Sequence, residues 1–306
     1  MAHYLITGGA GFIGSHLVEW LLKAGHRLTV IDDFSSGSRD NLPAHPELAV
    51  LAHDLLALTN EHLTGPFDAV VHLAALPSVN DSWTQLVRAH AINLTGTVRV
   101  IELAQELKIP RLVFASSAAV YGDTGLAPIE ETQRLRPASP YGLQKKSSEE
   151  YGRLLAGRHC TFIALRFFNV FGPRQVANSP YSGVITKFVQ AMRADQPVTI
   201  FGTGEQTRDF VYVKDIASGI VRALEAPGLD SFTVCNLGCG SAVSIRQLAA
   251  TMGALFPGWK GTINRAPARA GDIVHSVANI SVAQRLLSYR SCYSLESGLA
   301  EMLAEK

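Results

Sequence analysis

A tyrosine and a lysine stand four residues apart near the middle of the chain, and their spacing suits proton transfer. Tyr141 and Lys145 belong to the stretch Ser139-Pro-Tyr-Gly-Leu-Gln-Lys145, and residues four apart share one face of a helix. Because a neighbouring ammonium favours the ionised phenol, we expect Lys145 to lower the pKa of Tyr141. Such a phenol can exchange a proton with a substrate hydroxyl, and the same lysine can hold a ribose hydroxyl.

A glycine-rich segment near the N-terminus has the arrangement that a dinucleotide needs. Residues 3–7 form an apolar run typical of a buried strand, and residues 15–23 have helical periodicity. Between them, Gly8 and Gly11 allow a tight turn and close approach of the backbone to a pyrophosphate. Gly14 allows the helix to pack closely on the strand, and the helix N-terminus faces the phosphates.

An acidic residue at the end of the second expected strand indicates which nicotinamide cofactor is used. Residues 28–31 are apolar and are followed by Asp32. A carboxylate about 20 positions beyond the glycines accepts hydrogen bonds from a ribose 2′-hydroxyl and would repel a 2′-phosphate. Since the first arginine after Asp32 is Arg39, the sequence predicts NAD rather than NADP.

The elements that position these residues alternate regularly along the first half of the chain. Short apolar runs at 28–31, 49–52, 69–73, 111–116 and 161–166 alternate with helical stretches, which predicts an α/β fold with a Rossmann-type doubly wound parallel sheet. After about residue 168, prolines and glycines interrupt this rhythm. We therefore expect an NAD-binding domain at 1–167 and a smaller α/β lobe formed mainly by 168–306. A segment at about 213–239, which contains the strand-like run 232–237, is expected to return to the first sheet.

The composition excludes several classes of function. The chain has 306 residues with 27 Lys and Arg against 26 Asp and Glu, and it has no basic patch of the kind that binds nucleic acid. No apolar stretch is long enough to span a membrane, and the start of the chain lacks the pattern of a signal peptide, so we expect a cytoplasmic protein. The four cysteines and ten histidines show no metal-binding spacing, so no metal site is expected.

Taken together, the motifs resemble the extended short-chain dehydrogenase/reductases of the nucleotide-sugar epimerase/dehydratase group. The resemblance covers nearly the whole chain. It rests on the glycines and Asp32, on Asp54-Leu55, His72-Leu-Ala-Ala75, the segment 114–122 and Tyr141-x-x-x-Lys145, and later on the segments 165–174, 201–215 and 269–272.

This resemblance implies a set of catalytic and cofactor-binding residues. Tyr141 corresponds to the proton-transfer phenol, Lys145 to its partner at the nicotinamide ribose, and Ser117 to the serine that hydrogen-bonds the reacting oxygen of the sugar. Ser116 remains a rival for that last role. The implied NAD-binding residues are Gly8, Gly11, Phe12, Ile13, Gly14, Asp32, Asp33, Ser35, Ser36, Gly37, Asp54, Leu55, Leu73, Ala74, Ala75, Tyr141, Lys145 and Phe168.

The resemblance also implies that the substrate is a UDP-sugar. Its two phosphates suit the forked guanidinium of arginine. Asn93 matches an asparagine near the active site, but it is interpreted as structural rather than catalytic. The implied substrate-binding residues are Ser117, Asn169, Val184, Phe201, Arg208, Arg269, Asp272 and Ser276.

The reaction implied by the family is 4-epimerisation of a UDP-hexose through a transient 4-keto sugar, with tightly bound NAD. Residues 175–185 are similar to a segment of epimerases that accept UDP-N-acetylhexosamines. Ser276 occupies a place where some members carry a bulky tyrosine. UDP-Glc/UDP-Gal and UDP-GlcNAc/UDP-GalNAc therefore both remain open.

The sequence also bears on three alternative functions. A 4,6-dehydratase is disfavoured because that subgroup has an Asp-Glu pair where this chain has Ala118 and Ala119. A UDP-glucuronate 4-epimerase or decarboxylase remains possible. A non-catalytic NAD-binding protein is less favoured, since Ser117, Tyr141 and Lys145 are all present. By analogy with the family, helices at about 84–107 and 141–156 are expected to form a homodimer.

Overall fold

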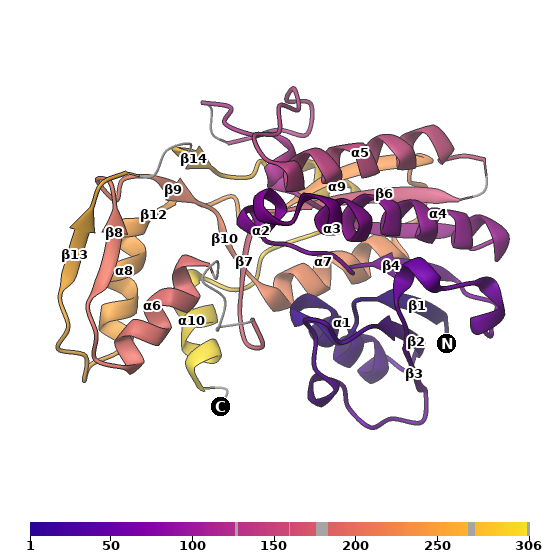
Figure 1. Cartoon of the computed structure of the whole chain (residues 1–306), viewed down its shortest axis with the longest axis horizontal. Coiled ribbons are helices and arrows are strands. Elements are labelled where there is room, and N and C mark those ends of the chain that lie inside the picture. Colours follow the sequence, from indigo (N-terminus) through magenta and orange to yellow (C-terminus); the bar gives the residue numbers. More distant parts are fainter. Residues whose placement is uncertain (126–127, 159, 176–182, 269–272, 305–306) are drawn as a thin grey trace.

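A seven-stranded parallel sheet forms the centre of the larger part of the protein (Figure 1). The computed structural model describes residues 1–125, 128–158, 160–175, 183–268 and 273–304. The strands lie side by side in the order β11-β6-β5-β4-β1-β2-β3, and every neighbouring pair is parallel. Their bounds are β1 (His3–Thr7), β2 (Arg27–Asp32), β3 (Leu48–Ala52), β4 (Ala69–His72), β5 (Arg111–Ser117), β6 (Thr161–Phe167) and β11 (Phe232–Leu237).

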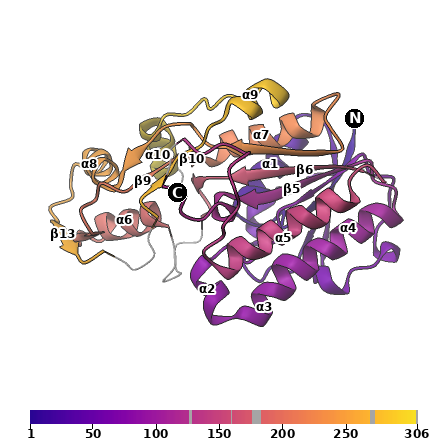
Figure 2. The ribbon, with the colours of Figure 1, turned by 90° about the horizontal axis from the view of Figure 1, so that it is seen from above.

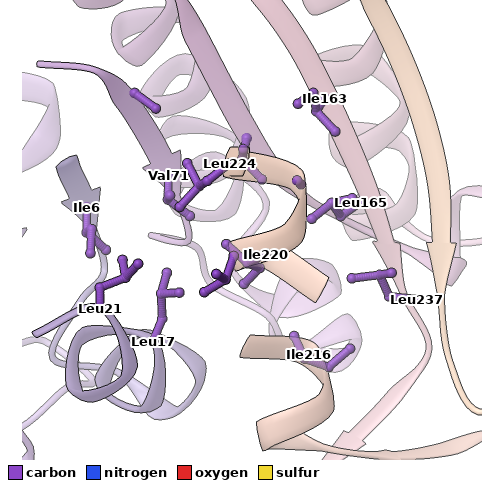
Figure 3. Close-up of a cluster of buried hydrophobic side chains, with 14 of the residues drawn as sticks. Ile6, Leu17, Leu21, Val71, Ile163, Leu165, Ile216, Ile220, Leu224 and Leu237 are labelled. Atoms are coloured by element: carbon purple, nitrogen blue, oxygen red, sulfur yellow. The ribbon is translucent and has the colours of Figure 1, made fainter. Parts of the chain in front are cut away.

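Helices cover both faces of this sheet. Helices α1 (Phe12–Lys23) and α7 (Val213–Glu225) pack against each other on one face, whereas α4 (Gly96–Glu106) and α5 (Pro140–Leu155) lie side by side on the other (Figures 1 and 2). Figure 3 shows the core on the first face, in which Leu17 and Leu21 of α1 and Ile216 and Ile220 of α7 belong to one cluster of buried side chains. Since helices cover both faces of a parallel sheet, the expected Rossmann-type doubly wound fold is confirmed.

The sequence explains why these segments take these forms. Val70 and Val71 of β4 point to opposite faces of the sheet, and both are fully buried because helices cover both faces. In α1, buried apolar residues recur at intervals of three or four, as from Leu17 to Leu21 and from Val18 to Leu22, so that one stripe of the helix faces the sheet. Consecutive apolar residues thus indicate the strand, and apolar residues three or four positions apart indicate the helix. Both patterns can be read from the local sequence alone.

A second lobe with its own apolar core is built from the later part of the chain (Figure 1). Its strands form three small sheets. They are β8 (Val198–Phe201) with β13 (Ile263–Ala266), β10 (Phe210–Tyr212) with β7 (Asn169–Phe171), and β9 (Thr207–Arg208) between β12 (Val243–Ser244) and β14 (His275–Ser276). The accompanying helices are α6 (Val184–Arg193), α8 (Ile245–Leu255) and α10 (Leu295–Ala304).

Parts of the later chain also contribute to the first core. Strand β11 lies beside β6 at the edge of the large sheet, and α7 covers one face of that sheet. Helix α9 (Ser281–Leu287) packs on β11 and α7, and its Leu287 belongs to the same apolar cluster as α1. The chain therefore passes between the two lobes more than once.

The strand order reverses between β1 and β4, because β2 lies on one side of β1 whereas β4 and β5 lie on the other. Ligands of open α/β sheets bind at the carboxyl ends of the strands where this reversal occurs. Two short helices, α2 (Val79–Thr84) and α3 (Leu86–His90), follow β4 on this side. A π-helical turn at Ala91–Thr95 continues them into α4. No helix in the described ranges is long and apolar enough to cross a membrane.

Candidate active site

The turn after β1 brings two segments into backbone contact. Gly8 has a φ of +72°, which favours glycine, and a Cβ atom built there would lie 2.6 Å from the backbone nitrogen of Ala74. A Cβ atom at Gly14 would overlap the carbonyl oxygen of Gly8. Gly11 precedes α1 and has no side chain to cap it, so the first N–H groups of the helix, at Phe12 and Ile13, lack an intrahelical acceptor.

Asp32 fixes the shape of this turn from the end of β2. Its two carboxylate oxygens accept hydrogen bonds from the backbone nitrogens of Ala10 and Phe34, both at 2.9 Å. Burial raises the pKa of Asp32, although the two backbone hydrogen bonds act in the opposite direction. The loop that follows is exposed at Asp33, Ser35 and Ser36. There the Ser35 side chain donates to Asp33 at 2.7 Å. Gly37 packs against the backbone of Ala10.

The other predicted cofactor residues also lie at carboxyl ends of strands. Asp54 follows β3 and accepts a hydrogen bond from the backbone nitrogen of Leu56 at 2.9 Å, while Leu55 is half-buried. Leu73, Ala74 and Ala75 follow β4 and are half-buried. Phe168 follows β6 and is buried, and its backbone nitrogen donates to Leu237 at 3.0 Å.

These features fit a dinucleotide. The glycine turn leaves no room for side chains between β1 and the segment after β4, the start of α1 presents backbone N–H groups, and a carboxylate stands at the end of β2. In dinucleotide-binding folds the pyrophosphate lies at the N-terminus of the helix, and a ribose hydroxyl hydrogen-bonds the carboxylate. This geometry supports the prediction that Gly8, Gly11, Gly14 and Asp32 hold NAD.

Helix α5 carries the candidate catalytic pair. Its start is fixed by Ser139, whose side chain accepts a hydrogen bond from the Gly142 nitrogen at 3.1 Å, and by Pro140 in the first turn. Gly142 allows the helix to touch the backbone of Ala119. Tyr141 and Lys145 both lie on the buried face of the helix, as their spacing predicts.

The expected effect of the lysine on the tyrosine is wrong. Burial raises the pKa of Tyr141 to about 12, and the only opposing cause is a hydrogen bond with Ser117. The Lys145 Nζ lies 5.8 Å from the centre of the Tyr141 ring, and it donates a hydrogen bond to the carbonyl oxygen of Ala115 at 2.8 Å. The ammonium thus faces strand β5, and removal of the phenol from water has the larger effect.

Lys145 is itself strongly perturbed. The side chain is buried, and its Nζ lies 4.7 Å from the centre of the Phe114 ring. Burial lowers the pKa of Lys145 to about 7, and the negative charge of Glu149 acts in the opposite direction. A lysine with a pKa near neutrality can change its charge within the working range of an enzyme.

The two neighbouring serines at the end of β5 have different surroundings. Ser116 is buried, and its hydroxyl donates to the carboxylate of Glu149. Ser117 is half-buried, accepts a hydrogen bond from the Ala119 nitrogen at 3.2 Å and is hydrogen-bonded to Tyr141. The contact with Tyr141 favours Ser117 as the serine that meets a substrate, because Ser116 is committed to the interior.

Three of the predicted substrate residues come together in the second lobe. Ser276 of β14 is the register partner of Arg208 in β9. Asn169 is exposed at the start of β7, and its backbone nitrogen donates at 3.0 Å to the carbonyl oxygen of Asp209, the next residue after Arg208. The small strands β7, β9 and β14 thus place Asn169, Arg208 and Ser276 near one another.

The remaining predicted substrate residues are more scattered. Val184 begins α6 and is half-buried, and Phe201 ends β8 and is half-buried. Arg269 and Asp272 lie outside the described residues, as does most of the segment 175–185.

Two buried polar residues near the site were not assigned a contact from the sequence. His72 at the end of β4 is hydrogen-bonded to Thr7 at 2.7 Å and Thr97 at 3.0 Å, and burial lowers the pKa of His72 to about 3. Asn93 lies in the π-helical turn and bonds both backbone groups of Leu76, and also the side chain of Gln144 in α5. These contacts agree with the structural interpretation of Asn93. His72 could have been suspected as a lone polar residue in an apolar strand.

Asp209, which lies between β9 and β10, was also not predicted as a site residue. It is fully buried, and its carboxylate accepts backbone hydrogen bonds from Cys239, Gly240 and Ala278. It therefore fixes the strand pair that carries Asn169. Among the described residues, no group of three or more His, Cys, Asp or Glu side chains is arranged to hold a metal ion.

Comparison with known proteins places this site in a family. A model described as the NAD dependent epimerase/dehydratase family matches residues 4–238. The chain is 35% identical over 308 residues to a UDP-glucose 4-epimerase of Mycolicibacterium smegmatis, covering 97% of this chain and 96% of the relative.

Solved structures agree closely with this arrangement. The UDP-N-acetylglucosamine 4-epimerase of Methanobrevibacter ruminantium, in complex with UDP-N-acetylmuramic acid, has 35% identity and a TM-score of 0.94, over 99% of this chain and 97% of that one. The UDP-glucuronic acid 4-epimerase of Bacillus cereus, in complex with UDP-glucuronic acid and NAD, has 31% identity and a TM-score of 0.90, over 99% and 98%. The chain therefore belongs to the NAD-dependent epimerase/dehydratase family.

Proposed function

We propose that the protein catalyses the 4-epimerisation of a UDP-hexose through a transient 4-keto sugar. The observation that carries the proposal is the meeting of Ser117, Tyr141 and Lys145 at the carboxyl end of β5, two strands from the glycine turn after β1. Similarity to 4-epimerases over nearly the whole chain supports the same reaction.

The protein's own residues have distinct tasks in this reaction. Ser117 orients the reacting oxygen of the sugar through its hydroxyl, and Tyr141 removes the proton from the 4-hydroxyl and later returns one. Lys145 supplies positive charge beside the phenol when a ligand lies between the two. Bound NAD would supply the acceptor and the donor of hydride. Because the 4-keto sugar must present its other face before reduction, the pocket has to leave room for rotation.

Two sugar classes are supported by different observations. Ser276, buried beside Arg208, is a small residue that would obstruct a 2-acetamido group less than a bulky one, and one of the similar structures is a UDP-N-acetylglucosamine 4-epimerase. The alignment with a UDP-glucose 4-epimerase supports the smaller hexoses. We therefore propose both UDP-Glc/UDP-Gal and UDP-GlcNAc/UDP-GalNAc as candidate substrates.

A second candidate is action on a UDP-hexuronate. The similar UDP-glucuronic acid 4-epimerase of Bacillus cereus is the observation that favours it. This activity would need cationic or hydroxyl groups around the sugar carboxylate. A 4,6-dehydratase is less supported, because the turn after Ser117 contains Ala118 and Ala119, which cannot exchange protons.

We also propose how the chain is divided and assembled. Residues 1–167, with the segment at about 213–239, would bind NAD, and residues 168–306 would mainly bind the UDP-sugar. An apolar surface on α3 and α5 would join two copies into a homodimer. It surrounds an open pocket of about 440 Å³ lined by Leu86, Val87, His90, Leu94, Pro140, Leu143, Gln144 and Ser147.

The proposed function is tested by incubating the protein separately with UDP-glucose, UDP-N-acetylglucosamine and UDP-glucuronate, and by resolving the products chromatographically. Formation of the C4 epimer from either neutral sugar supports the proposal. Formation of a pentose, or turnover of UDP-glucuronate alone, would favour the second candidate. The cofactor released by denaturing the protein should be NAD(H), and recovery of mainly NADP(H) would contradict the role given to Asp32.

A further inference from the structure

A fully buried ion pair lies directly behind the catalytic lysine. Glu149 of α5 and Arg166 of β6 have side chains that are 3% and 4% exposed. Arg166 donates from Nε to one carboxylate oxygen of Glu149 at 2.9 Å and from Nη2 to the other at 2.7 Å. This two-point contact fixes both planar groups. Nothing in the proposed proton transfer uses either residue, so the pair needs another explanation.

The pair belongs to a group of contacts that fixes the position of helix α5 on strand β5. Tyr141, Lys145 and Glu149 follow one another at intervals of four residues, so they lie along one face of the helix. Tyr141 is hydrogen-bonded to Ser117, Lys145 donates to the carbonyl oxygen of Ala115, and Glu149 accepts from the hydroxyl of Ser116. Three successive turns of α5 therefore contact three consecutive residues of β5.

Arg166 is also held by contacts with residues other than Glu149. Ser116 and Arg166 are register partners in adjacent strands. Arg166 also donates to the hydroxyl of Tyr121 at 2.8 Å, and this hydroxyl donates to Asn236 of β11 at 2.7 Å. The guanidinium lies 4.8 Å from the centre of the Tyr121 ring. Through these contacts the Glu149–Arg166 pair is connected to β5, β6 and β11.

The charges around Lys145 give the pair a second consequence. Titratable groups that face the lysine are Tyr141 and Glu149 from its own helix and His72 from β4. Arg166 of β6 stands behind Glu149. Burial keeps the pKa of Tyr141 high and that of His72 low, so both groups are neutral near pH 7. Among these neighbours, Glu149 carries the negative charge that faces the ammonium.

We propose that Glu149 is a positioning residue for the reaction: it sets the register of α5 on β5 and supplies the counter-charge that faces Lys145. Arg166 holds the carboxylate in place for both tasks. This inference rests on the proposed function only in giving the lysine a part in turnover. The contacts themselves concern the charge and position of Lys145, and they can be measured whether or not a substrate is turned over.

The test compares Glu149→Gln with Glu150→Gln. Glutamine at 149 keeps the shape of the side chain and an acceptor for Ser116 but removes the charge. Glu150 is the adjacent residue of the same helix, and its ion pair with Arg153 is about half exposed. Since neutralising Glu149 removes the ion-pair partner of the buried Arg166, the double variant Glu149→Gln/Arg166→Met provides a second sample in which neither charge remains.

Two readouts are needed. In protein with ¹³C-labelled lysine, the Lys145 resonance is assigned by its loss in Lys145→Met and then titrated by NMR. The pH dependence of kcat is measured on the UDP-hexose that the wild type turns over. We expect the Lys145 titration, and the alkaline fall of kcat with it, to move to lower pH by about one pH unit in Glu149→Gln. The shift should have the same direction but be smaller in the double variant, because the positive charge of Arg166 is removed together with the negative charge of Glu149. Glu150→Gln should match the wild type in both measurements.

An unchanged Lys145 titration in folded Glu149→Gln or in the folded double variant would overturn the proposal, even if kcat fell uniformly, because Glu149 would then be only structural. Should the wild type turn over no UDP-sugar, the proposed function fails, while the NMR titration still decides the role of Glu149. If Glu149→Gln does not fold, the titration of the double variant decides alone.

Discussion

The Lys145 ammonium lies 5.8 Å from the centre of the Tyr141 ring, one helical turn away on the buried face of α5. Its hydrogen bond goes to the carbonyl oxygen of Ala115. The pair is thus brought together by helical spacing, but burial raises the pKa of Tyr141 to about 12. A phenol in this environment stays protonated near neutral pH, so we expect Tyr141 to accept a proton only after bound ligands have changed its surroundings.

Replacing Tyr141 by phenylalanine should abolish most of the activity and spare the fold. The ring would keep its packing, whereas the proton carrier and the hydrogen bond with Ser117 would be lost. Loss of a general acid–base typically lowers the rate by about 10²–10⁴-fold. Tyr151→Phe, on the exposed part of the same helix, serves as the control and should keep wild-type kcat. Near-normal turnover in Tyr141→Phe would show that another residue transfers the proton.

His72 should make the protein less stable in mild acid. Its folded pKa is about 3, below the value of about 6.5 expected when unfolded. Stability from the neutral ring is therefore complete above pH 6.5 and is lost as the pH falls from 6.5 toward 3. The free energy of unfolding should drop by about 2 kcal/mol between pH 7.5 and pH 5 from this group alone.

Denaturant unfolding at the two pH values checks this. In His72→Gln, which can still bond Thr7 and Thr97, the drop should be smaller by that amount. His45→Gln, at an exposed turn, should behave like the wild type. An equal drop in wild type and His72→Gln would mean that the buried imidazole does not control acid stability.

A tyrosine at position 276 should discriminate between sugar classes. Ser276 is buried and pairs in register with Arg208, so a larger side chain there must displace its neighbours and would reduce the space for a UDP-sugar bound beside it. Ser276→Tyr should lower kcat/KM for UDP-N-acetylhexosamines and leave UDP-glucose or UDP-galactose turnover largely intact, because a built-in clash acts on the larger ligand. Ser276→Ala is the matched control and should preserve both. Equal losses on both classes would show that the residue at position 276 does not discriminate between the sugars.

The apolar surface on α3 and α5 should form a homodimer. Val87 is 85% exposed and Leu143 is 55% exposed, and exposed apolar patches mark interfaces. Light scattering at micromolar concentration should give twice the monomer mass of 32.9 kDa. Leu143→Glu should shift the protein toward the monomer, whereas Leu286→Glu on α9 should not. A monomeric wild type would refute the proposed assembly.

Local patterns were enough to predict the sheet and the cofactor turn. The spacing of Gly8, Gly11 and Gly14 and the apolar run of each strand depend on near neighbours in sequence, and the structure places these elements as expected. Helical periodicity also placed Tyr141 and Lys145 on one face.

Contacts that depend on strand register could not be predicted in the same way. Ser116 and Ser117 are adjacent and chemically identical, and only the packing of α5 on β5 gives the first to Glu149 and the second to Tyr141. The raised pKa of Tyr141 likewise comes from tertiary burial. Glu149 stands four residues after Lys145, so its shared face was visible in the sequence, but its pairing with Arg166 needed the register of β5 and β6.

The most direct test of 4-epimerisation uses UDP-glucose and UDP-N-acetylglucosamine carrying deuterium at C4. Each accepted sugar should give its C4 epimer with the deuterium still at C4, because in the proposed reaction the hydrogen removed from that carbon returns to it within one bound complex. NMR of the purified product reports both configuration and label. Loss of the label to solvent would contradict the proposed 4-epimerisation. So would a failure to form the C4 epimer from both sugars.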